Sequence, residues 1–361
     1  MNKGTSTPGG VSAPSSRARS RAFTALAACA LAAGTTAVAA APASASTPAA
    51  DAYGSCTSMR LPVALAAGQP AGQTVAATLC VPNSTTAPGR IDLLVHGATY
   101  NRSYWDWPTD SGAYSYVAET LRAGRATFSF DQVGSGQSSH PASSAVTSAA
   151  GEYVLHQMIC FLRSSGYGTV DVVAHSLGSA LAVAEAAQFH DVDRLVVTGL
   201  LHQEFAASAP PTSPFYPASD DPQFAGAGLD SGYLTTVPGT RGPQYYSASA
   251  DPLVIAYDEG HKDAVPEYLL AAGLSAQDPP SQNPSSGVTA PVLVIDGNQD
   301  AQFCGKTVDC TDALRLQANE SSYYTSSPSV TAVFVADTGH DLALHPSAAQ
   351  SFAIIDSWLT G

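Results

Sequence analysis

Short apolar runs alternate with amphipathic segments over most of the chain beyond residue 90. The apolar runs predict buried strands over residues 91–96, 126–130, 170–174, 194–198, 291–295 and 330–336. Helical patterns lie between and after them, over residues 114–123, 149–164, 177–189 and 347–359. Nearly continuous apolar strands that alternate with helices are typical of a parallel sheet covered on both faces.

Two more strands are predicted before these runs, over residues 59–65 and 74–81, with a turn-rich segment between them. A hairpin centred there places Cys56 nearly opposite Cys80, so we expect a disulfide across the two strands. With the hairpin the sheet has eight strands. The predicted fold class is therefore α/β, with a mostly parallel eight-stranded sheet.

The alternation breaks once, between residues 198 and 291, where more than ninety residues precede the next strand. A connection of that length is unusual inside a compact domain. Residues 206–228 are rich in Pro, Ser, Ala and Gly, and residues 251–272 have a helical pattern. We therefore expect residues 201–287 to form an inserted cap, between core segments 46–200 and 288–361.

The first 45 residues have the pattern of a secretory signal peptide. Basic residues up to Arg21 precede an Ala-rich apolar stretch, and the small residues 42–45 end it. We expect cleavage near Ala45 and a secreted protein. A retained membrane anchor and a lipoprotein attached at Cys29 are the alternatives.

Charge narrows the choice of partners. Four of the 15 basic residues and none of the 29 acidic ones lie in the leader, so the rest of the chain has a formal charge of −18. Nucleic acid and anionic membrane surfaces are poor partners for such a chain. A small, neutral or apolar substrate fits better, and the oligomeric state stays open.

The most informative segment runs from Val170 to Leu181, where a β-branched strand passes directly into a helix of small residues. Ser176 lies at the junction, in a G-x-S-x-G pattern with Ala174 in place of the first glycine. A serine on such a sharp turn projects above the sheet, where it can act as a nucleophile. Its hydroxyl needs an imidazole to take the proton, and the imidazole needs a carboxylate to orient it.

Two later segments carry these groups. Residues 291–300 form a strand and a loop that ends at Asp300, and residues 333–340 form the last strand and a loop that ends at His340. With the serine turn, these motifs resemble the α/β-hydrolase family over nearly the whole chain, from residue 59 to 359. The resemblance implies Ser176 as nucleophile, Asp300 as acid and His340 as base. Other carboxylates and one other histidine near strand ends are alternatives, namely Asp296, Asp337, Asp341, Glu204 and His345.

The loop that follows strand 91–96 resembles the oxyanion loop of that family. Its residues His96 to Thr99 imply that the backbone N–H groups of Ala98 and Leu177 hold the developing oxyanion. We interpret His96 as structural. The aromatic residues just after the loop either pack in the core or line an acyl pocket, and they are Tyr100, Tyr104, Trp105 and Trp107.

Together these features predict a secreted serine hydrolase that cleaves a carboxylic ester through an acyl-enzyme. A lactonase or thioesterase acting on a secondary metabolite, a capped exopeptidase and a non-catalytic binding protein are the alternatives. Related dehalogenases and epoxide hydrolases carry an aspartate at the elbow, which Ser176 argues against. No metal or organic cofactor is expected.

The remaining cysteines have separate expectations. Cys304 and Cys310 follow Asp300 closely, and a bridge between them would limit the movement of that carboxylate. Zinc is the alternative use of such a pair, but no second pair at ligand spacing accompanies it. Cys160 lies in an apolar helical segment, where we expect a small buried side chain.

Overall fold

The computed structural model describes residues 48–83, 89–108, 112–202, 214–304 and 308–361, all within one compact unit. The predicted leader and the alternative acid Glu204 lie outside the described residues. Within the described ranges, no helix is both long and apolar enough to cross a membrane.

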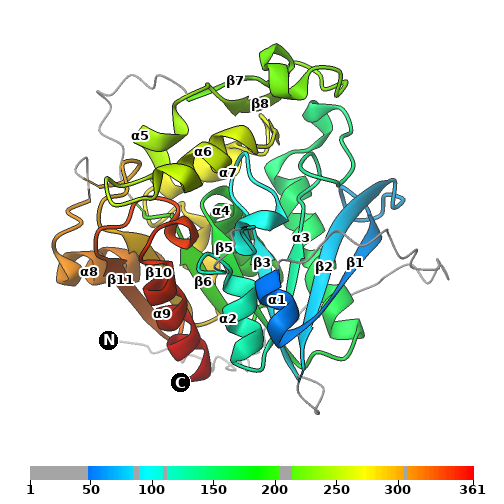
Figure 1. Ribbon diagram of the computed structural model, residues 1–361. Coiled ribbons are helices and arrows are strands. Elements are labelled where there is room, and N and C mark those ends of the chain that lie inside the picture. Colours follow the sequence, from blue (N-terminus) through cyan, green and yellow to red (C-terminus); the bar gives the residue numbers. More distant parts are fainter. Residues whose placement is uncertain (1–47, 84–88, 109–111, 203–213, 305–307) are drawn as a thin grey trace, which may run out of the picture. The chain divides into compact units, whose positions relative to one another are not determined.

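An eight-stranded, mostly parallel sheet forms the centre of the protein, as the sequence predicts (Figure 1). Its strand order is β1-β2-β4-β3-β5-β6-β10-β11. The strands are β1 (Gly54–Val63), β2 (Gln73–Pro82), β3 (Arg90–Val95), β4 (Ala126–Phe130), β5 (Thr169–His175), β6 (Arg194–Thr198), β10 (Val292–Gly297) and β11 (Val330–Val335). Six of these strands, β4, β3, β5, β6, β10 and β11, are parallel, so their carboxyl ends all lie at one edge of the sheet.

The first two strands form the predicted hairpin. β1 and β2 are antiparallel, and Cys56 is paired directly with Cys80 in their register. The two cysteines form a disulfide with Cα atoms 4.0 Å apart. The hairpin joins the parallel strands through antiparallel pairing of β2 with β4.

Helices cover both faces of the sheet, and each face has its own apolar core. On one face α3 (Ser148–Ser164), α4 (Leu177–Phe189) and α8 (Ala313–Tyr323) pack against residues such as Val172 and Val294. On the other face α2 (Tyr116–Arg122) and α9 (Ala348–Thr360) pack against Val173 and Leu293. Alternate residues of each strand therefore point to different cores, as expected for buried parallel strands. Helix α1 (Pro48–Tyr53) precedes the hairpin, and Cys160 is buried in α3.

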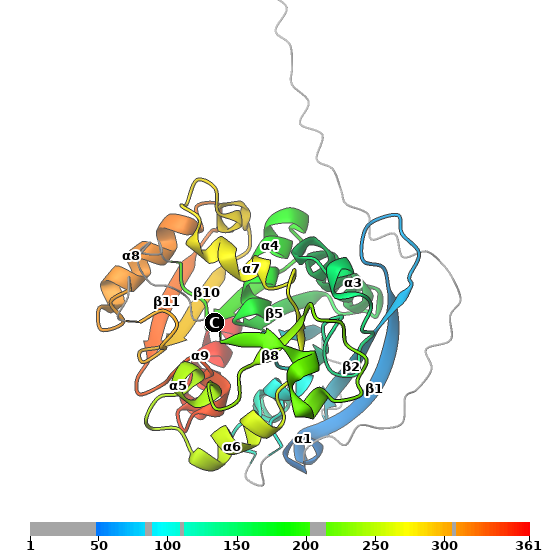
Figure 2. The same cartoon turned by 90° about the horizontal axis from the view of Figure 1, so that it is seen from above.

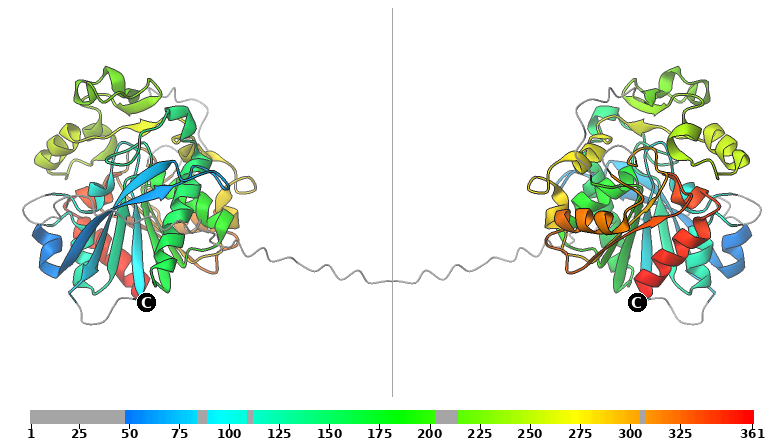
Figure 3. Two further views of the ribbon diagram at one scale, coloured as in Figure 1. Left: turned by 90° about the vertical axis from the view of Figure 1, so that its right-hand side faces the viewer. Right: turned by 90° about the vertical axis from the view of Figure 1, so that its left-hand side faces the viewer.

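The segment between β6 and β10 lies above the carboxyl edge of the sheet (Figures 1 and 3). It contains a small antiparallel sheet of β7 (Phe215–Pro217), β8 (Tyr233–Thr236) and β9 (Val265–Pro266). Its helices are α5 (Arg241–Tyr245), α6 (Pro252–Gly260) and α7 (Ala271–Leu274). Seen from above, β8 lies over the sheet and α7 lies beside α4 (Figure 2). We refer to residues 201–287 as the cap segment.

One prediction for this segment is wrong. Residues 251–272 form no single helix, because α6 ends at Gly260 and Val265 and Pro266 belong to a strand. Glycine has a poor helix propensity, and proline lacks the N–H group that a helix interior needs. Helix α8, after Asp300, was not predicted from the sequence; its face toward the core contains only a few buried residues.

Candidate active site

Ser176 lies at the sharp turn between β5 and α4. Its backbone has φ of 52° and ψ of −119°, which is a strained combination for a residue with a side chain. Gly178 is equally constrained, because a Cβ atom there would lie 2.5 Å from the carbonyl oxygen of His96. Ala174, which replaces the first glycine of the motif, is fully buried. The small residues around Ser176 therefore allow the close packing that this turn requires.

His340 lies between Ser176 and Asp300. Its Nε2 atom is 2.9 Å from Ser176 Oγ, and its Nδ1 atom is 2.7 Å from Asp300 Oδ2. The three residues come from the loops after β5, β10 and β11, which meet at the carboxyl edge of the sheet. Asp300 and His340 are buried, whereas Ser176 is partly exposed. The structure thus joins, in one hydrogen-bonded chain, the three side chains put forward from the sequence.

The histidine and the aspartate stabilise each other's charge. Burial disfavours the charged imidazolium, but the Asp300 carboxylate outweighs it and raises the pKa of His340 above its ordinary value of 6.5. Burial likewise disfavours the carboxylate, but His340 and the backbone N–H of Gln302 lower the pKa of Asp300. That N–H donates to Asp300 Oδ1 over 2.7 Å. The geometry suits a histidine that alternates between a neutral and a charged form.

The loop of residues 96–99 lies directly beside the serine. A Cβ atom on Gly97 would lie 3.1 Å from the Cβ atom of Ser176. His96 Nε2 accepts a hydrogen bond of 3.0 Å from the backbone N–H of Gln132, whose side-chain Nε2 donates to the His96 carbonyl oxygen over 2.6 Å. His96 therefore fixes the loop, as a structural residue would. Within the described residues, the N–H groups of Ala98 and Leu177 have no hydrogen-bond partner in the protein.

A second histidine–aspartate pair lies behind this chain, and the sequence analysis missed it. His175 Nε2 lies 3.0 Å from Asp341 Oδ1, and both side chains are fully buried. The Tyr100 hydroxyl donates to Asp341 and lies 3.0 Å from Asp258 Oδ2. His175 precedes Ser176 and Asp341 follows His340, so position in the sequence was the signal that could have identified the pair.

The same network reaches into the cap segment through Arg241 of α5. This fully buried arginine donates from Nε and Nη2 to the two carboxylate oxygens of Asp258, each over 2.8 Å. Its Nη1 donates to Thr99 Oγ1 over 2.7 Å, and Thr99 has a positive φ of 59°. Nothing in the sequence around Arg241 indicates this role. The cap segment is therefore hydrogen-bonded to the loop beside Ser176.

The alternative residues have other partners. Asp341 is bound to His175 and Tyr100, and Asp337 Oδ1 accepts from the Gln299 side chain over 3.1 Å. His345 Nε2 accepts backbone N–H groups instead of facing the serine. Asp296 Oδ1 accepts from the backbone N–H of Gly297 over 2.7 Å.

The four aromatic side chains that follow the loop of residues 96–99 are buried in the core, and the Tyr104 ring stacks on His175 with centroids 4.4 Å apart. Their described contacts correspond to packing.

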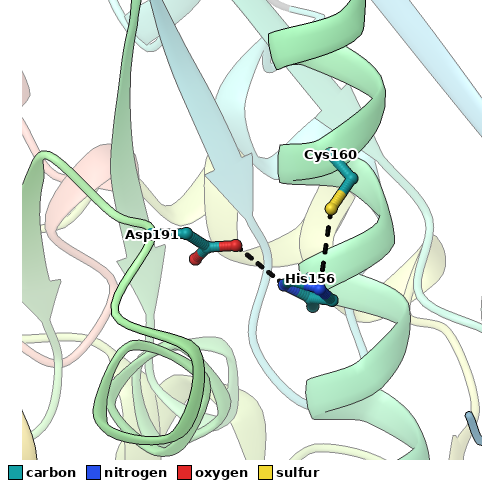
Figure 4. Close-up of side chains that lie close together, drawn as sticks. All are labelled: His156, Cys160 and Asp191. Atoms are coloured by element: carbon teal, nitrogen blue, oxygen red, sulfur yellow. Dashed lines mark hydrogen bonds and ion pairs between the residues drawn. The ribbon is translucent and has the colours of Figure 1, made fainter. Parts of the chain in front are cut away.

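Two groups of side chains in the described ranges have the composition of a metal site. His175, His340 and Asp341 form one, but their ring nitrogens already bind Asp341, Asp300, Ser176 and Thr198. In the other group the His156 ring lies between Asp191 and Cys160 (Figure 4). Its Nδ1 is 2.7 Å from Asp191 Oδ2 and its Nε2 is 3.5 Å from Cys160 Sγ, so the two partners face different nitrogens.

The Cys304–Cys310 bridge is present, with Cα atoms 5.4 Å apart. The backbone N–H of Cys304 donates to the Asp300 carbonyl oxygen over 2.8 Å. The bridge therefore closes a short loop that is hydrogen-bonded to Asp300. Residues 305–307, within this loop, lie outside the described residues.

Comparison with known proteins identifies the family. The model of the Alpha/beta hydrolase family matches residues 93–351. No curated protein sequence matches the chain. Among solved structures it is similar to a thermophilic esterase from Thermogutta terrifontis, with 18% identity over 84% of this chain and 98% of the esterase and a TM-score of 0.54.

Two other similar structures have different activities. The thioesterase domain from the curacin biosynthetic pathway is 16% identical over 84% of this chain and 99% of that domain, with a TM-score of 0.50. An epoxide hydrolase from Vigna radiata is 13% identical over 84% of this chain and 98% of the hydrolase, with a TM-score of 0.53. At these identities the similarity concerns the fold alone.

Proposed function

This chain belongs to the alpha/beta hydrolase family, and within it we propose a serine hydrolase that cleaves a carboxylic ester through an acyl-enzyme. The observation that carries the proposal is the chain of hydrogen bonds from Ser176 through His340 to Asp300. A serine hydroxyl becomes an effective nucleophile when a neutral imidazole accepts its proton and a buried carboxylate orients that imidazole.

The first half of the reaction forms the acyl-enzyme. The Ser176 hydroxyl donates its proton to His340 Nε2 while Oγ attacks the ester carbonyl carbon, and the imidazolium so formed keeps its Nδ1–H on Asp300. When the tetrahedral intermediate collapses, the bond to the alcohol oxygen breaks and that oxygen takes the proton from Nε2. Ser176 is then acylated and His340 is neutral again.

The second half uses water in place of the alcohol. His340 accepts a proton from water as the water oxygen attacks the acyl carbon, and it returns the proton to Ser176 Oγ when the acid leaves. In both halves we assign the developing oxyanion to the N–H groups of Ala98 and Leu177, because Ala98 lies on the loop beside Ser176 and Leu177 follows it at the start of α4. Loss of one such donor typically costs about 3 kcal/mol of transition-state stabilisation.

A neutral substrate is part of the proposal. Arg241, the basic residue that reaches the loop beside Ser176, has its charge paired with Asp258. It therefore offers no unpaired positive charge to a substrate anion. The net negative charge of the chain after the predicted leader also favours a neutral substrate over an anionic one.

Secretion is proposed on two observations. Residues 1–45 have the pattern of a signal peptide, and the described residues contain two disulfides, Cys56–Cys80 and Cys304–Cys310. Disulfides persist in oxidising compartments outside the cytosol. N-terminal sequencing of the protein recovered from culture medium tests this, with a first residue near Ser46 expected and a cell-retained, full-length chain contradicting it.

The catalytic proposal is tested by labelling with a phosphonate that mimics the tetrahedral intermediate. We expect one adduct, located on Ser176 by peptide mass spectrometry, and none in Ser176→Ala. Ser179 offers a matched control, because it is a buried serine in helix α4, which directly follows Ser176, and its hydroxyl donates to the Thr198 carbonyl oxygen. Ser179→Ala should label normally. An adduct elsewhere, or full esterase activity in Ser176→Ala, would overturn the mechanism.

A panel of substrates then separates the reactions that this mechanism permits. Carboxylic esters, lactones, thioesters and aminoacyl amides would be compared by kcat/KM, with Ser176→Ala as the blank for each. We expect simple esters to be the best substrates. If aminoacyl amides had the highest kcat/KM, the esterase proposal would be wrong and the protein would be an exopeptidase.

A further inference from the structure

Two buried carboxyl groups lie at the end of β10, and the reaction as described uses only one of them. Asp296 ends the strand and Asp300 follows four residues later; both side chains are fully buried. Asp300 Oδ2 binds His340 and Oδ1 accepts from the backbone N–H of Gln302. Asp296 Oδ1 accepts from the N–H of Gly297, over 2.7 Å.

The second oxygen of Asp296 has no ordinary partner. Among the described residues Oδ2 receives no hydrogen bond, although it is shielded from solvent. The Asp296 carboxyl is within hydrogen-bonding reach of the Asp300 carboxyl. Two ionised carboxylates in such a position would repel each other, and neither could donate.

The charged groups that face Asp296 are also acidic. They are Asp300, on its own turn, and Glu320, on α8, which packs against the same face of the sheet. Tyr104, from the segment after the oxyanion loop, is the other titratable group within electrostatic range. Burial, with the Asp300 charge as the next cause, raises the pKa of Asp296 well above its ordinary value. A proton on Asp296 removes the conflict because it turns an acceptor into a donor.

We propose that Asp296 is a protonated positioning residue, whose Oδ2–H donates a hydrogen bond to the Asp300 carboxylate. The proposal rests on the assignment of Asp300 as the acid of the reaction. With Asp296 neutral, the two carboxyls share a single negative charge, which matches the single positive charge of the imidazolium. The hydrogen bond gives the Asp300 side chain a partner in addition to His340 and the Gln302 N–H, so the carboxylate keeps its orientation as His340 changes charge.

Two substitutions separate a neutral donor from a merely structural side chain. Asp296→Asn keeps the shape and, through its amide N–H, the donor, so we expect kcat within about twofold of wild type. Asp296→Leu removes the donor, so kcat should fall about tenfold while KM changes little. Glu185→Gln is the matched control, because Glu185 is another fully buried carboxyl, on α4, whose contacts to His156 and Asp191 lie outside this chain of residues.

Infrared difference spectroscopy observes the proton directly and does not depend on a destabilised variant. At neutral pH the spectrum of wild type minus Asp296→Asn should contain the carbonyl stretch of a protonated carboxylic acid, shifted in D₂O. Wild type minus Glu185→Gln should contain a similar band with no change in kcat. A missing band for Asp296, or a loss of kcat in Asp296→Asn as large as in Asp296→Leu, would overturn the inference.

Failure of the proposed function gives a different result. If wild type forms no phosphonate adduct at Ser176, the esterase mechanism is wrong, whatever the infrared bands show. If wild type is labelled and the Asp296 band is absent, only the protonated Asp296 is wrong.

Discussion

Arg241 Nη1 donates a hydrogen bond of 2.7 Å to Thr99 Oγ1, joining the cap segment to the loop that we propose as half of the oxyanion hole. Thr99 is a β-branched residue with a positive φ, which is an unfavourable backbone conformation. The hydrogen bond from a buried guanidinium therefore fixes a loop that would relax without it.

Thr99→Val tests this relationship. The substitution keeps the shape of the side chain and removes the oxygen, so we expect kcat to fall about tenfold as the Ala98 N–H loses its position. Thr236→Val is the control, because Thr236 Oγ1 also lies 3.3 Å from Arg241 Nη1 but is on β8 of the cap segment. Both variants should lose about 1–3 kcal/mol of stability. If Thr99→Val and Thr236→Val lost kcat equally, the hydrogen bond between Arg241 and Thr99 would contribute to stability and not to the position of the Ala98 N–H.

The pH profile tests the Asp300–His340 pair. His340 must be neutral to accept the serine proton, so kcat/KM rises with pH through the pKa of His340. Because Asp300 raises that pKa, the midpoint of the acidic limb should lie above 6.5. Asp300→Asn should move the midpoint down and lower kcat by roughly 10³- to 10⁴-fold. An unchanged midpoint in Asp300→Asn would mean that a group other than the Asp300–His340 pair determines the acidic limb of the profile.

The two disulfides should differ in what they support. The Cys304–Cys310 bridge closes a loop hydrogen-bonded to the Asp300 backbone, so Cys304→Ser with Cys310→Ser should lower kcat more than it raises KM. The Cys56–Cys80 bridge lies in the β1–β2 hairpin, so replacing it should mainly lower the unfolding free energy, by roughly 3 kcal/mol. Steady-state kinetics and urea unfolding of the two double variants decide the matter. A normal kcat without Cys304–Cys310 would contradict a role at Asp300.

Glu185 should make the stability depend on pH. Burial, with Asp191 adding to it, raises the pKa of Glu185 to about 8 from its ordinary 4.5. A carboxyl whose pKa rises on folding contributes most below its ordinary pKa and loses that contribution as pH rises toward 8. Glu185→Gln should therefore stabilise the protein by about 1–3 kcal/mol more at pH 8 than at pH 5. The control is Glu119→Gln, whose side chain is partly exposed, and this variant should have no such dependence in urea unfolding.

Substrate choice should depend on the cap segment. The Tyr245 ring of α5 lies 5.5 Å from the His340 ring, measured between centroids. Tyr245→Ala should open space there and move the preference toward bulkier acyl groups, with a smaller effect in Tyr245→Phe. The measurement is kcat/KM over a series of acyl chains. If Tyr245→Ala ranked the acyl chains in the same order as wild type, this part of the cap segment would not determine selectivity.

The features that could be predicted from the sequence are those marked by residues close together in the chain. The strand–serine–helix segment around Ser176 and the loops that end at Asp300 and His340 each combine a hydrophobic run with a chemically distinctive residue. Arg241 has no such signal, because its partners Thr99 and Asp258 stand 142 and 17 residues away. The helix expected over residues 251–272 failed for a related reason. Residues 265–266 form strand β9 because they pair with β8, and hydrophobic periodicity along the chain cannot predict such a pairing.

The sequence distances across the site have a consequence for folding. Ser176 and His340 are 164 residues apart, and Tyr100 reaches Asp341 across 241. Such contacts form late, because the intervening chain must first be brought together. During synthesis β11 and the His340 loop leave the ribosome after β5 and β10, so a nascent chain that stops before His340 cannot form the hydrogen-bonded chain from Ser176 to Asp300. If Ser176 is the nucleophile that we propose, it becomes able to react with a phosphonate only after β11 joins the sheet, and labelling of Ser176 then reports completed folding.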